Sequence, residues 1–252
     1  MEVATTEPGA HELVYVLPDA HGVSTRVYEY GGGAYEVLPS SEGGATSQEV
    51  IFSDASDENA VKVLAVDTGA VRTVVGGKPW LRYAEFAACG ASRWVLAVEE
   101  DHSKPEPKDV RNYVVAVDAG SGEVRRLVEG ADFYSSPRYG PDGRWISWRS
   151  WDHPDMPWQD SVLRWAQVLG NTGREGLLLG TVSTVAGGKP GEAVGESAWG
   201  LDGALYWTQE DEGSDWRQLW RQWPGDSTTP EKLKLDGLDE VEIGDCSMLM
   251  GA

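Results

Sequence analysis

The stretch SPRYGPDGRWISW (Ser136–Trp148) has a counterpart further along the chain in ESAWGLDGALYW (Glu196–Trp207). In both, an aromatic residue and a glycine precede an Asp-Gly pair, and a strand-like apolar run follows. Asp-Gly favours the tight turns that join antiparallel strands, because glycine adopts positive φ without steric cost. The two stretches therefore predict the same β-hairpin twice, and YAEFAACGASRWVLAV (Tyr83–Val98) is a weaker third copy.

A second hairpin pattern recurs beside the first. VLAVDTGAVRTVVGG (Val63–Gly77) matches VVAVDAGSGEVRRLVEG (Val114–Gly130), and further copies are Leu163–Gly188, with a longer turn, and Gln218–Leu235. The two patterns together give about four short strands in every 50 to 60 residues or so, which is typical of propeller blades. No run at helical period reaches helix length, and Ser161–Leu169 is predicted as a strand.

The predicted fold is therefore an all-β propeller in a single domain spanning residues 1–252. About four to five blades of four short antiparallel strands are recognisable, which leaves open an incomplete seven-blade ring. The approximate blades are residues 10–80, 81–130, 131–188 and 189–240. A β-sandwich whose hairpins are alike by chance is the alternative, and the matched turns argue against it.

The composition limits the classes of partner. Acidic residues outnumber basic ones 41 to 21, for a formal net charge of −20. Proteins that bind a phosphate backbone need a cationic surface, so we expect neither nucleic acid nor an anionic membrane as a partner. The acidity favours solubility, and the alternative is a field that attracts cationic ligands.

Cysteine content and the N-terminal sequence bear on location. Cys89 and Cys246 are the only cysteines, which is too few for a disulfide framework. The first residues lack the basic and apolar regions of a signal peptide, and the longest apolar runs are strand-sized. We expect a cytoplasmic protein without a membrane span and without a cofactor.

Three places in the sequence resemble one protein family. They are TRVYEYGGGAY (Thr25–Tyr35), LRYAEF with VEEDHS (Leu81–Phe86 and Val98–Ser103), and EGADFYSSPRYGPDGRWISWRSWDHPDMPW (Glu129–Trp158). In this order they resemble the prolyl oligopeptidase family, in its dipeptidyl-aminopeptidase and acylaminoacyl-peptidase branch. The resemblance covers roughly residues 10–220, and Tyr28 stands where the family segment has His.

The resemblance implies a propeller that restricts access to a serine peptidase. In the family, a seven-bladed propeller covers an α/β-hydrolase domain whose Ser lies in a G-x-S-x-G elbow. All matching segments belong to the propeller, and no G-x-S-x-G occurs in this chain; the nearest sequence, Gly195–Trp199, ends in Trp and falls in a predicted hairpin. We therefore expect an access-gating, substrate-selecting domain without a catalytic triad and without activity of its own.

Two other functions stay open at this stage. A free-standing small propeller would bind, or even convert, a small molecule in its central channel. A scaffold would instead bind protein partners by its faces. The expected partners are thus a peptide or small molecule in the channel, and a hydrolase domain or a second copy at an open edge strand.

Candidate site residues come mainly from the family-like segments, where charged and aromatic side chains gather. They either line the channel or the hydrolase-facing surface, or they are polar groups that tie blade to blade. The set is Arg26, Glu29, Tyr30, Glu99, Asp101, His102, Tyr134, Arg138, Asp152, His153 and Trp158.

Two motifs receive a structural interpretation. The Asp-His pairs at 101–102 and 152–153 offer too few ligands for zinc, so we expect no metal and assign them to loop hydrogen bonds. Gly31–Gly33 lacks the following helix of a phosphate loop, so it predicts a close approach of the backbone where a strand begins.

Overall fold

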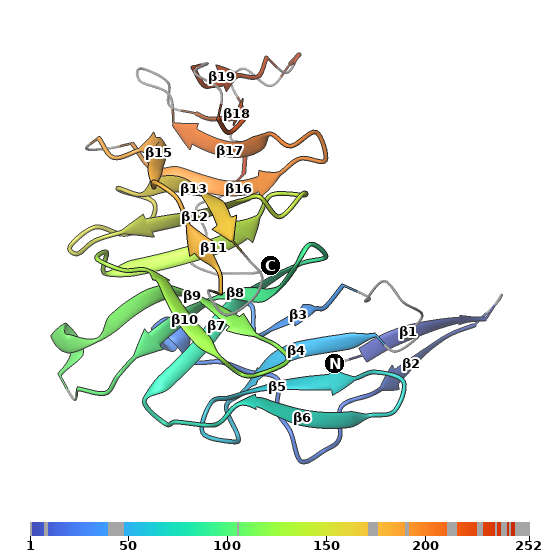
Figure 1. Cartoon of the computed structure of the whole chain (residues 1–252). Coiled ribbons are helices and arrows are strands. Elements are labelled where there is room, and N and C mark those ends of the chain that lie inside the picture. Colours follow the sequence, from blue (N-terminus) through green and yellow to red (C-terminus); the bar gives the residue numbers. More distant parts are fainter. Residues whose placement is uncertain are drawn as a thin grey trace.

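The chain folds into four antiparallel sheets that follow one another along the sequence and lie in an open arc (Figure 1). The computed structural model describes residues 2–7, 10–39, 48–104, 106–170, 176–189, 192–210, 216–225, 229–234, 236–237, 241 and 243–244. The first sheet, β3–β6, and the fourth, β16–β19, lie at opposite ends of the arc. Within the described part, no helix is long and apolar enough to cross a membrane.

Each sheet is a meander, because consecutive strands pair with one another. The first sheet holds β3 (Tyr35–Val37), β4 (Glu49–Asp54), β5 (Ala60–Ala65) and β6 (Ala70–Val75). The second holds β7 (Leu81–Cys89), β8 (Ser92–Asp101), β9 (Arg111–Asp118) and β10 (Val124–Val128). The third holds β11 (Phe133–Tyr139), β12 (Trp145–Trp151), β13 (Val162–Gly170), β14 (Leu178–Leu179) and β15 (Ser183–Gly187), the last two both pairing with β13. The fourth holds β16 (Val194–Trp199), β17 (Leu205–Glu210), β18 (Arg217–Gln222) and β19 (Glu231–Lys232).

Four short elements of the described part stand outside these sheets. β1 (Glu2–Glu7) and β2 (Ala10–Tyr15) form a separate two-stranded sheet that projects beside the first sheet in Figure 1. The 3₁₀ helices are η1 (Val27–Glu29) and η2 (Pro107–Asp109).

The matched Asp-Gly stretches form matched turns. Gly143 and Gly203 have φ of +70° and +80°, a region that favours glycine. In the first turn the Asp142 carboxylate accepts the N–H of Arg144, and in the second the Asp202 carboxylate accepts the N–H of Ala204. The same side-chain chemistry thus closes the β11–β12 and β16–β17 hairpins.

The first strands of the sheets form the inner edge of the arc. β7 contacts β3 on one side and β11 on the other, and β11 also contacts β16. This radial arrangement of meander sheets is that of a β-propeller, so the predicted all-β propeller fold is confirmed.

A buried carboxylate ties the inner strands together. β7 carries a bulge at Glu85 and β11 one at Ser136, both with positive φ. Glu85 is 1% exposed, and its carboxylate accepts the N–H of Ser136 at 3.1 Å. Burial raises the pKa of the Glu85 carboxyl. This side chain therefore couples the second sheet to the third at the inner edge.

Apolar side chains fill the joints between neighbouring sheets. In the joint between the second and third sheets, Leu96 of β8 packs in one cluster with Trp148 of β12. In the joint between the third and fourth, Leu163 of β13 packs in one cluster with Trp207 of β17. Burying each such side chain contributes about 1.5–3 kcal/mol. The propeller is thus stabilised sheet against sheet.

Candidate functional site

Residues 25–33 run from the end of β4, where the Ser24 N–H binds the Ser53 carbonyl, to β7 at the inner edge of the arc. Val27 of η1 is fully buried in the cluster between the second and third sheets. Gly31 has φ +85°, and a side chain there would meet the Thr25 carbonyl. The Gly33 carbonyl accepts the N–H of Glu85 at 2.7 Å, and β3 begins at Tyr35. The glycine run is therefore a close backbone approach at the start of a strand.

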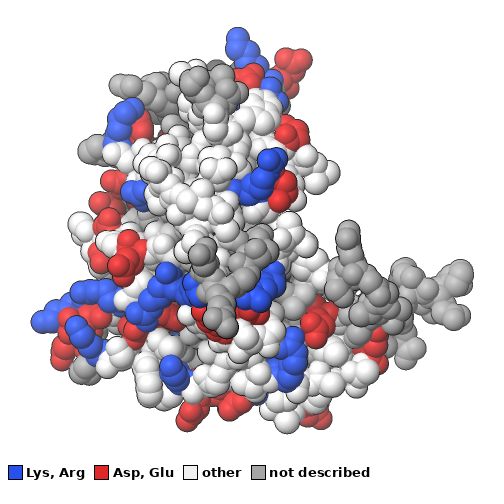
Figure 2. Space-filling view, in the orientation of Figure 1, with Lys and Arg blue, Asp and Glu red and all other residues white. Residues whose placement is uncertain are grey.

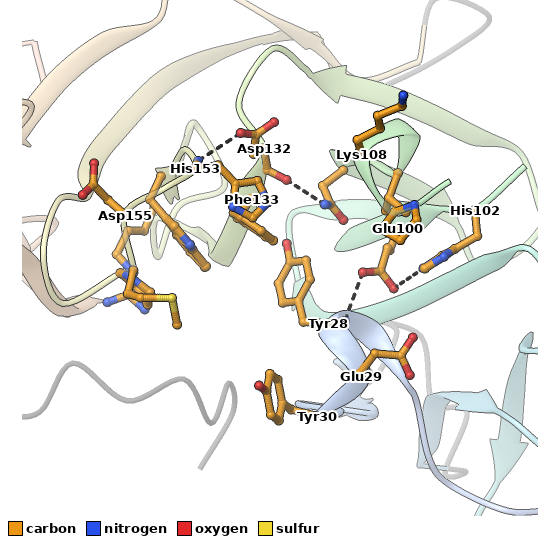
Figure 3. Close-up of a pocket in the computed structure, with 17 residues that line it drawn as sticks. Tyr28, Glu29, Tyr30, Glu100, His102, Lys108, Asp132, Phe133, His153 and Asp155 are labelled. Atoms are coloured by element: carbon orange, nitrogen blue, oxygen red, sulfur yellow. Dashed lines mark hydrogen bonds and ion pairs between the residues drawn. The ribbon is translucent and has the colours of Figure 1, made fainter. Parts of the chain in front are cut away.

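This segment forms one wall of a pocket of about 500 Å³, named here the rim pocket (Figure 3). The other walls come from the end of β8, the loop that contains η2, the start of β11, and the end of β12 with the loop after it. Its lining residues are Tyr28, Glu29, Tyr30, Glu100, His102, Pro107, Lys108, Val110, Asn112, Asp132, Phe133, Arg149, Trp151, His153, Asp155, Met156 and Pro157.

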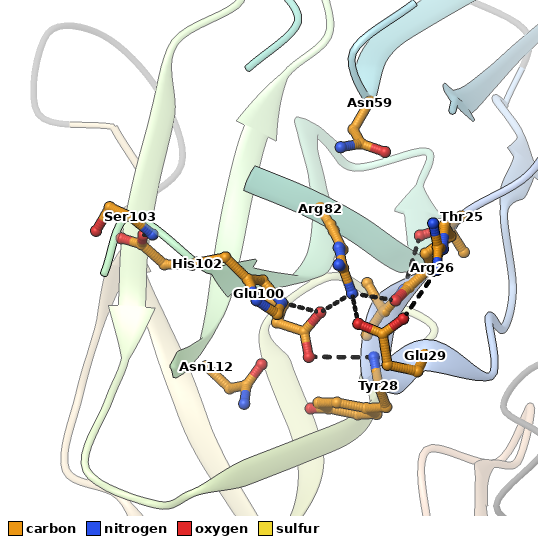
Figure 4. A network of polar contacts seen from close by, with 12 residues as sticks. Thr25, Arg26, Tyr28, Glu29, Asn59, Arg82, Glu100, His102, Ser103 and Asn112 are labelled. Atoms are coloured by element: carbon orange, nitrogen blue, oxygen red, sulfur yellow. Dashed lines mark hydrogen bonds and ion pairs between the residues drawn. The ribbon is translucent and has the colours of Figure 1, made fainter. Parts of the chain in front are cut away.

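Glu100 is the most connected carboxylate of the rim pocket and is 4% exposed (Figure 4). It lies between Arg82 and Asn112 in a row across β7, β8 and β9, because the register pairs Glu100 with both. Its Oε1 accepts the N–H of Tyr28 at 3.1 Å, and its Oε2 lies 3.2 Å from Arg82 Nη1 and 2.8 Å from His102 Nε2. The position of the carboxylate is therefore fixed from several sides.

Arg82 extends this network toward the solvent. Its Nη1 also donates to Glu29 Oε1 and to the Arg26 carbonyl, both at 2.7 Å. The hydrogen bond from Arg82 is the main reason that the pKa of Glu29 lies below its ordinary value. Glu29 therefore stays ionised at the mouth of the rim pocket.

Asn112 holds a buried acceptor at the wall of the rim pocket. Its side chain is 3% exposed, and its Nδ2 donates to the Asp132 carbonyl at 2.7 Å. This bond fixes which way the amide faces, because only the nitrogen can donate. Within the part of the chain that the structure describes, the buried Oδ1 has no hydrogen-bond partner. A buried acceptor without a partner costs about 1–3 kcal/mol, so the site favours a ligand that donates.

Aromatic rings form the opposite side of the rim pocket. The Phe133 ring stacks on Trp151 with centroids 5.3 Å apart, and meets the rings of Tyr28 and His153 edge-on at 5.3 and 4.8 Å. The Tyr28 hydroxyl donates to the Tyr134 carbonyl at 2.8 Å and accepts the N–H of Tyr134 at 3.0 Å. Burial raises the pKa of Tyr28. The rim pocket thus has an acidic side and an aromatic side.

Several predicted residues meet here. Glu29, Tyr30, His102 and His153 line the rim pocket. Asp152 accepts the Asp132 N–H at 2.7 Å and so fixes two of the pocket loops. Tyr134 provides the backbone groups that hold Tyr28, and Arg26 pairs with Glu29 at 3.1 Å on the surface.

The other predicted residues lie elsewhere. Side chains alternate along β8, so Glu99 and Asp101 face away from the rim pocket and bind Arg126, each at 2.7 Å. Arg138 lies 4.0 Å from Glu85 at the inner edge. Trp158 is 44% exposed and is not among the lining residues.

Sequence reasoning missed part of the lining. Asp132, Phe133 and Trp151 fall inside the family-like stretch Glu129–Trp158, which gave a signal for them. Asn112 and Lys108 lie outside the family-like stretches, and only the strand pairing brings Asn112 beside Glu100.

The arrangement is suited to binding a cationic group. No Ser, Thr or Cys is among the residues that line the rim pocket, so it lacks the nucleophiles of serine, threonine and cysteine hydrolases. Among the described residues, no group of three or more His, Cys, Asp and Glu side chains could hold a metal ion. Buried oxygen acceptors beside aromatic rings favour an ammonium group.

Comparisons with known proteins agree with the fold. No protein-family model and no curated protein matches the chain. Among solved structures, a puromycin-hydrolyzing peptidase of Mycobacterium tuberculosis is 26% identical, with a TM-score of 0.74, over 93% of this chain and 35% of that one. A puromycin hydrolase is 29% identical, with a TM-score of 0.71, over 89% of this chain and 34% of that one. An oligogalacturonate lyase, 14% identical with a TM-score of 0.56 over 73% of this chain and 50% of that one, shares the fold alone.

The class of protein is therefore a β-propeller with a pocket on one rim. More narrowly, its structural neighbours are puromycin-hydrolysing peptidases of the prolyl oligopeptidase family, and the chain corresponds to their propeller part. It spans about a third of the length of those peptidases.

Proposed function

We propose that this chain is the substrate-selecting propeller region of a prolyl-oligopeptidase-type hydrolase, and that the rim pocket binds the amino end of an aminoacyl or peptide substrate. The observation that carries the proposal is the pair of buried acceptors, the Glu100 carboxylate and Asn112 Oδ1, which lie side by side in the rim pocket.

An ammonium group suits these acceptors. It carries a positive charge and three N–H donors, so it can bond a carboxylate and an amide oxygen together. Glu29 adds negative charge to the same side, Asp132 adds it beside His153, whose N–H its carboxylate accepts at 3.0 Å, and the chain carries a formal net charge of −20. On the face shown in Figure 2, basic and acidic side chains are mixed, so the support from charge comes from the net charge of the whole chain.

The names of the related peptidases support this class of ligand. Puromycin is an aminoacyl amide with an aromatic side chain and a free amino group, so it offers an ammonium and a ring together. Cleavage itself is assigned to a hydrolase domain, in the same polypeptide or in a partner, because no Ser, Thr or Cys lines the rim pocket.

Calorimetric titration of the purified chain tests the proposal, with phenylalaninamide and N-acetylphenylalaninamide as ligands. We expect the free amine to bind at least about tenfold more tightly, because acetylation removes the charge. Glu100→Gln is expected to remove this preference for the free amine. The control is Glu123→Gln, which should leave the preference intact, because Glu123 is exposed, pairs with Arg125 and lies outside the rim pocket. Equal binding of the two ligands by the unmodified chain contradicts the proposal.

A fluorophosphonate probe separates this proposal from a propeller that converts its own ligand. We expect no labelling of the chain, since serine hydrolase chemistry is assigned elsewhere. Stoichiometric labelling, or turnover of an aminoacyl arylamide by the chain alone, would overturn that assignment.

A further inference from the structure

The Tyr28 ring lies between the two sides of the rim pocket. In Figure 3 it stands with Phe133 and His153 on one side and Glu100 and His102 on the other. Its ring centroid is 5.3 Å from that of Phe133, while its own N–H binds the Glu100 carboxylate. One residue thus touches both the acidic and the aromatic wall.

Tyr28 is held at both ends and has little freedom to move. Its backbone has φ +56°, which is unusual for a residue with a side chain and is fixed here by the bond to Glu100. Its hydroxyl both donates to and accepts from the backbone of Tyr134. The ring is therefore a rigid separator and not a mobile flap.

The Tyr28 hydroxyl is used by the fold and does not take part in the lining of the rim pocket. Because it is engaged with Tyr134, the ring offers the rim pocket only its apolar surface. The His that the resembling family segment has at this place would instead offer a ring nitrogen. In this chain the position therefore acts through shape and not through a polar contact.

We infer that the rim pocket recognises two groups of one ligand, a primary ammonium and an apolar ring, and that Tyr28 determines the distance between them. The inference rests on the proposed function, since it takes the ammonium site at Glu100 and Asn112 as given. The aromatic site is the surface of Phe133 and Trp151. Tyr28 is a specificity-determining residue in this scheme.

The test is a series of phenylalkylamines, from benzylamine to 4-phenylbutylamine, titrated into the purified full chain. A simple apolar pocket would give an affinity that rises about threefold to fourfold with each added CH₂. A fixed separator gives a maximum at one length, with weaker binding on either side. If no amine binds, the proposed function fails; if affinity rises steadily with length, only the spacing inference fails.

Variants of Tyr28 test whether this residue sets the amine length that binds most tightly. Tyr28→Ala is expected to abolish the maximum, whereas Tyr28→Phe keeps the ring and the same preferred length. Tyr35→Ala, which removes an exposed ring on β3 outside the rim pocket, leaves the whole profile unchanged. A maximum that survives Tyr28→Ala overturns the role of this residue. If Tyr28→Ala does not fold, the profile of Tyr28→Phe still decides, because a changed preferred length contradicts the inference.

Discussion

At two joints of the propeller, a side-chain hydroxyl makes the same pair of hydrogen bonds to the first residues of an inner strand, but the two side chains differ in length. Where β16 begins, between the third and fourth sheets, the Ser161 hydroxyl donates to the Val194 carbonyl at 2.9 Å and accepts its N–H at 3.0 Å. Where β11 begins, between the second and third sheets, the Tyr28 hydroxyl makes the same pair of bonds to Tyr134. Each hydroxyl thus binds the backbone N–H and C=O of one residue at the start of an inner strand.

The two hydroxyls differ in the length of their side chains and in the segment that supplies them. Ser161 is short and belongs to the third sheet's own loop, so it draws the fourth sheet close, and Arg149 adds bonds to the Val194 and Gly195 carbonyls. Tyr28 reaches the same kind of position with a whole ring, from a segment outside the repeat. The rim pocket therefore lies at the joint that residues 25–33 enter from outside the repeat, whereas Ser161 makes the corresponding bonds from within the repeat.

The apolar clusters at the two joints are expected to stabilise the fold equally. Truncating a large buried side chain in either cluster should have the largest effect on stability. Trp148 and Trp207 occupy matching strands and are 0% and 1% exposed. Trp148→Ala and Trp207→Ala are each expected to lower the free energy of unfolding by about 3–5 kcal/mol. Urea denaturation measures both. A loss below about 1 kcal/mol for one of them would show that its joint is not a packed core.

The two hydroxyls give the next largest effect and test the comparison directly. Ser161→Ala and Tyr28→Phe each leave a backbone N–H and C=O without that partner, so each should cost about 1–3 kcal/mol. Ser183→Ala, on an exposed position of β15, is the control and should cost less than about 0.5 kcal/mol. If either hydroxyl variant matches the control, the two joints are not held in the same way.

Acid should loosen the stretch of chain that leads into residues 25–33. The Asp54 carboxylate is buried, which by itself raises its pKa, but hydrogen bonds from Ser56, Lys62 and His21 outweigh this and lower it. Asp54 also accepts the N–H of Gly22, so it fixes to the first sheet the stretch of chain just before residues 25–33.

Because the folded-state pKa of Asp54 lies below the unfolded value of about 3.9, its stabilisation is present above that pH and is lost as the pH falls. We expect the free energy of unfolding to fall by about 1–2 kcal/mol on acidification below about pH 5, and by less in Asp54→Asn. Denaturation curves at several pH values measure this, with the exposed Asp19→Asn as control. Identical pH profiles for Asp54→Asn and the unmodified chain would refute it.

The smallest effect is expected at the mouth of the rim pocket. The Arg26 and Glu29 side chains pair at 3.1 Å but are 68% and 57% exposed. Arg26→Ala should therefore change the free energy of unfolding by no more than about 0.5 kcal/mol. The same variant should leave amine binding within about twofold, since Arg82 still holds Glu29. A larger change in either measurement would place Arg26 in the binding site itself.

The fold could be predicted from the sequence because its signals are local. Asp-Gly turns and alternating apolar runs define hairpins within a few residues, and the repetition of hairpins implies sheets that pack around a common edge. The turns at Asp142 and Asp202 have the side-chain bonds that this chemistry predicts. The β-propeller was thus accessible without knowledge of any long-range contact.

The candidate site could be predicted only in part, because it depends on register. In the run VEEDHS, alternation directs Glu100 and His102 to the rim pocket but Glu99 and Asp101 to the opposite face. The predicted set held Glu99, Asp101 and His102 and missed Glu100, because the run alone does not show which face lines a pocket. Asn112 becomes a site residue only because β9 pairs with β8 in the observed register. A shift of one residue would turn it away.

The bond between Tyr28 and Tyr134 spans 106 residues of sequence and has a consequence for how the molecule folds. During synthesis, residues 25–33 emerge long before β11, so their binding position does not exist when they leave the ribosome. Contacts of such separation form late, because a large loop must close first. The sheets are therefore expected to gain hydrogen-exchange protection before the Tyr134 amide does, and the rim pocket to be the last part of the propeller to appear.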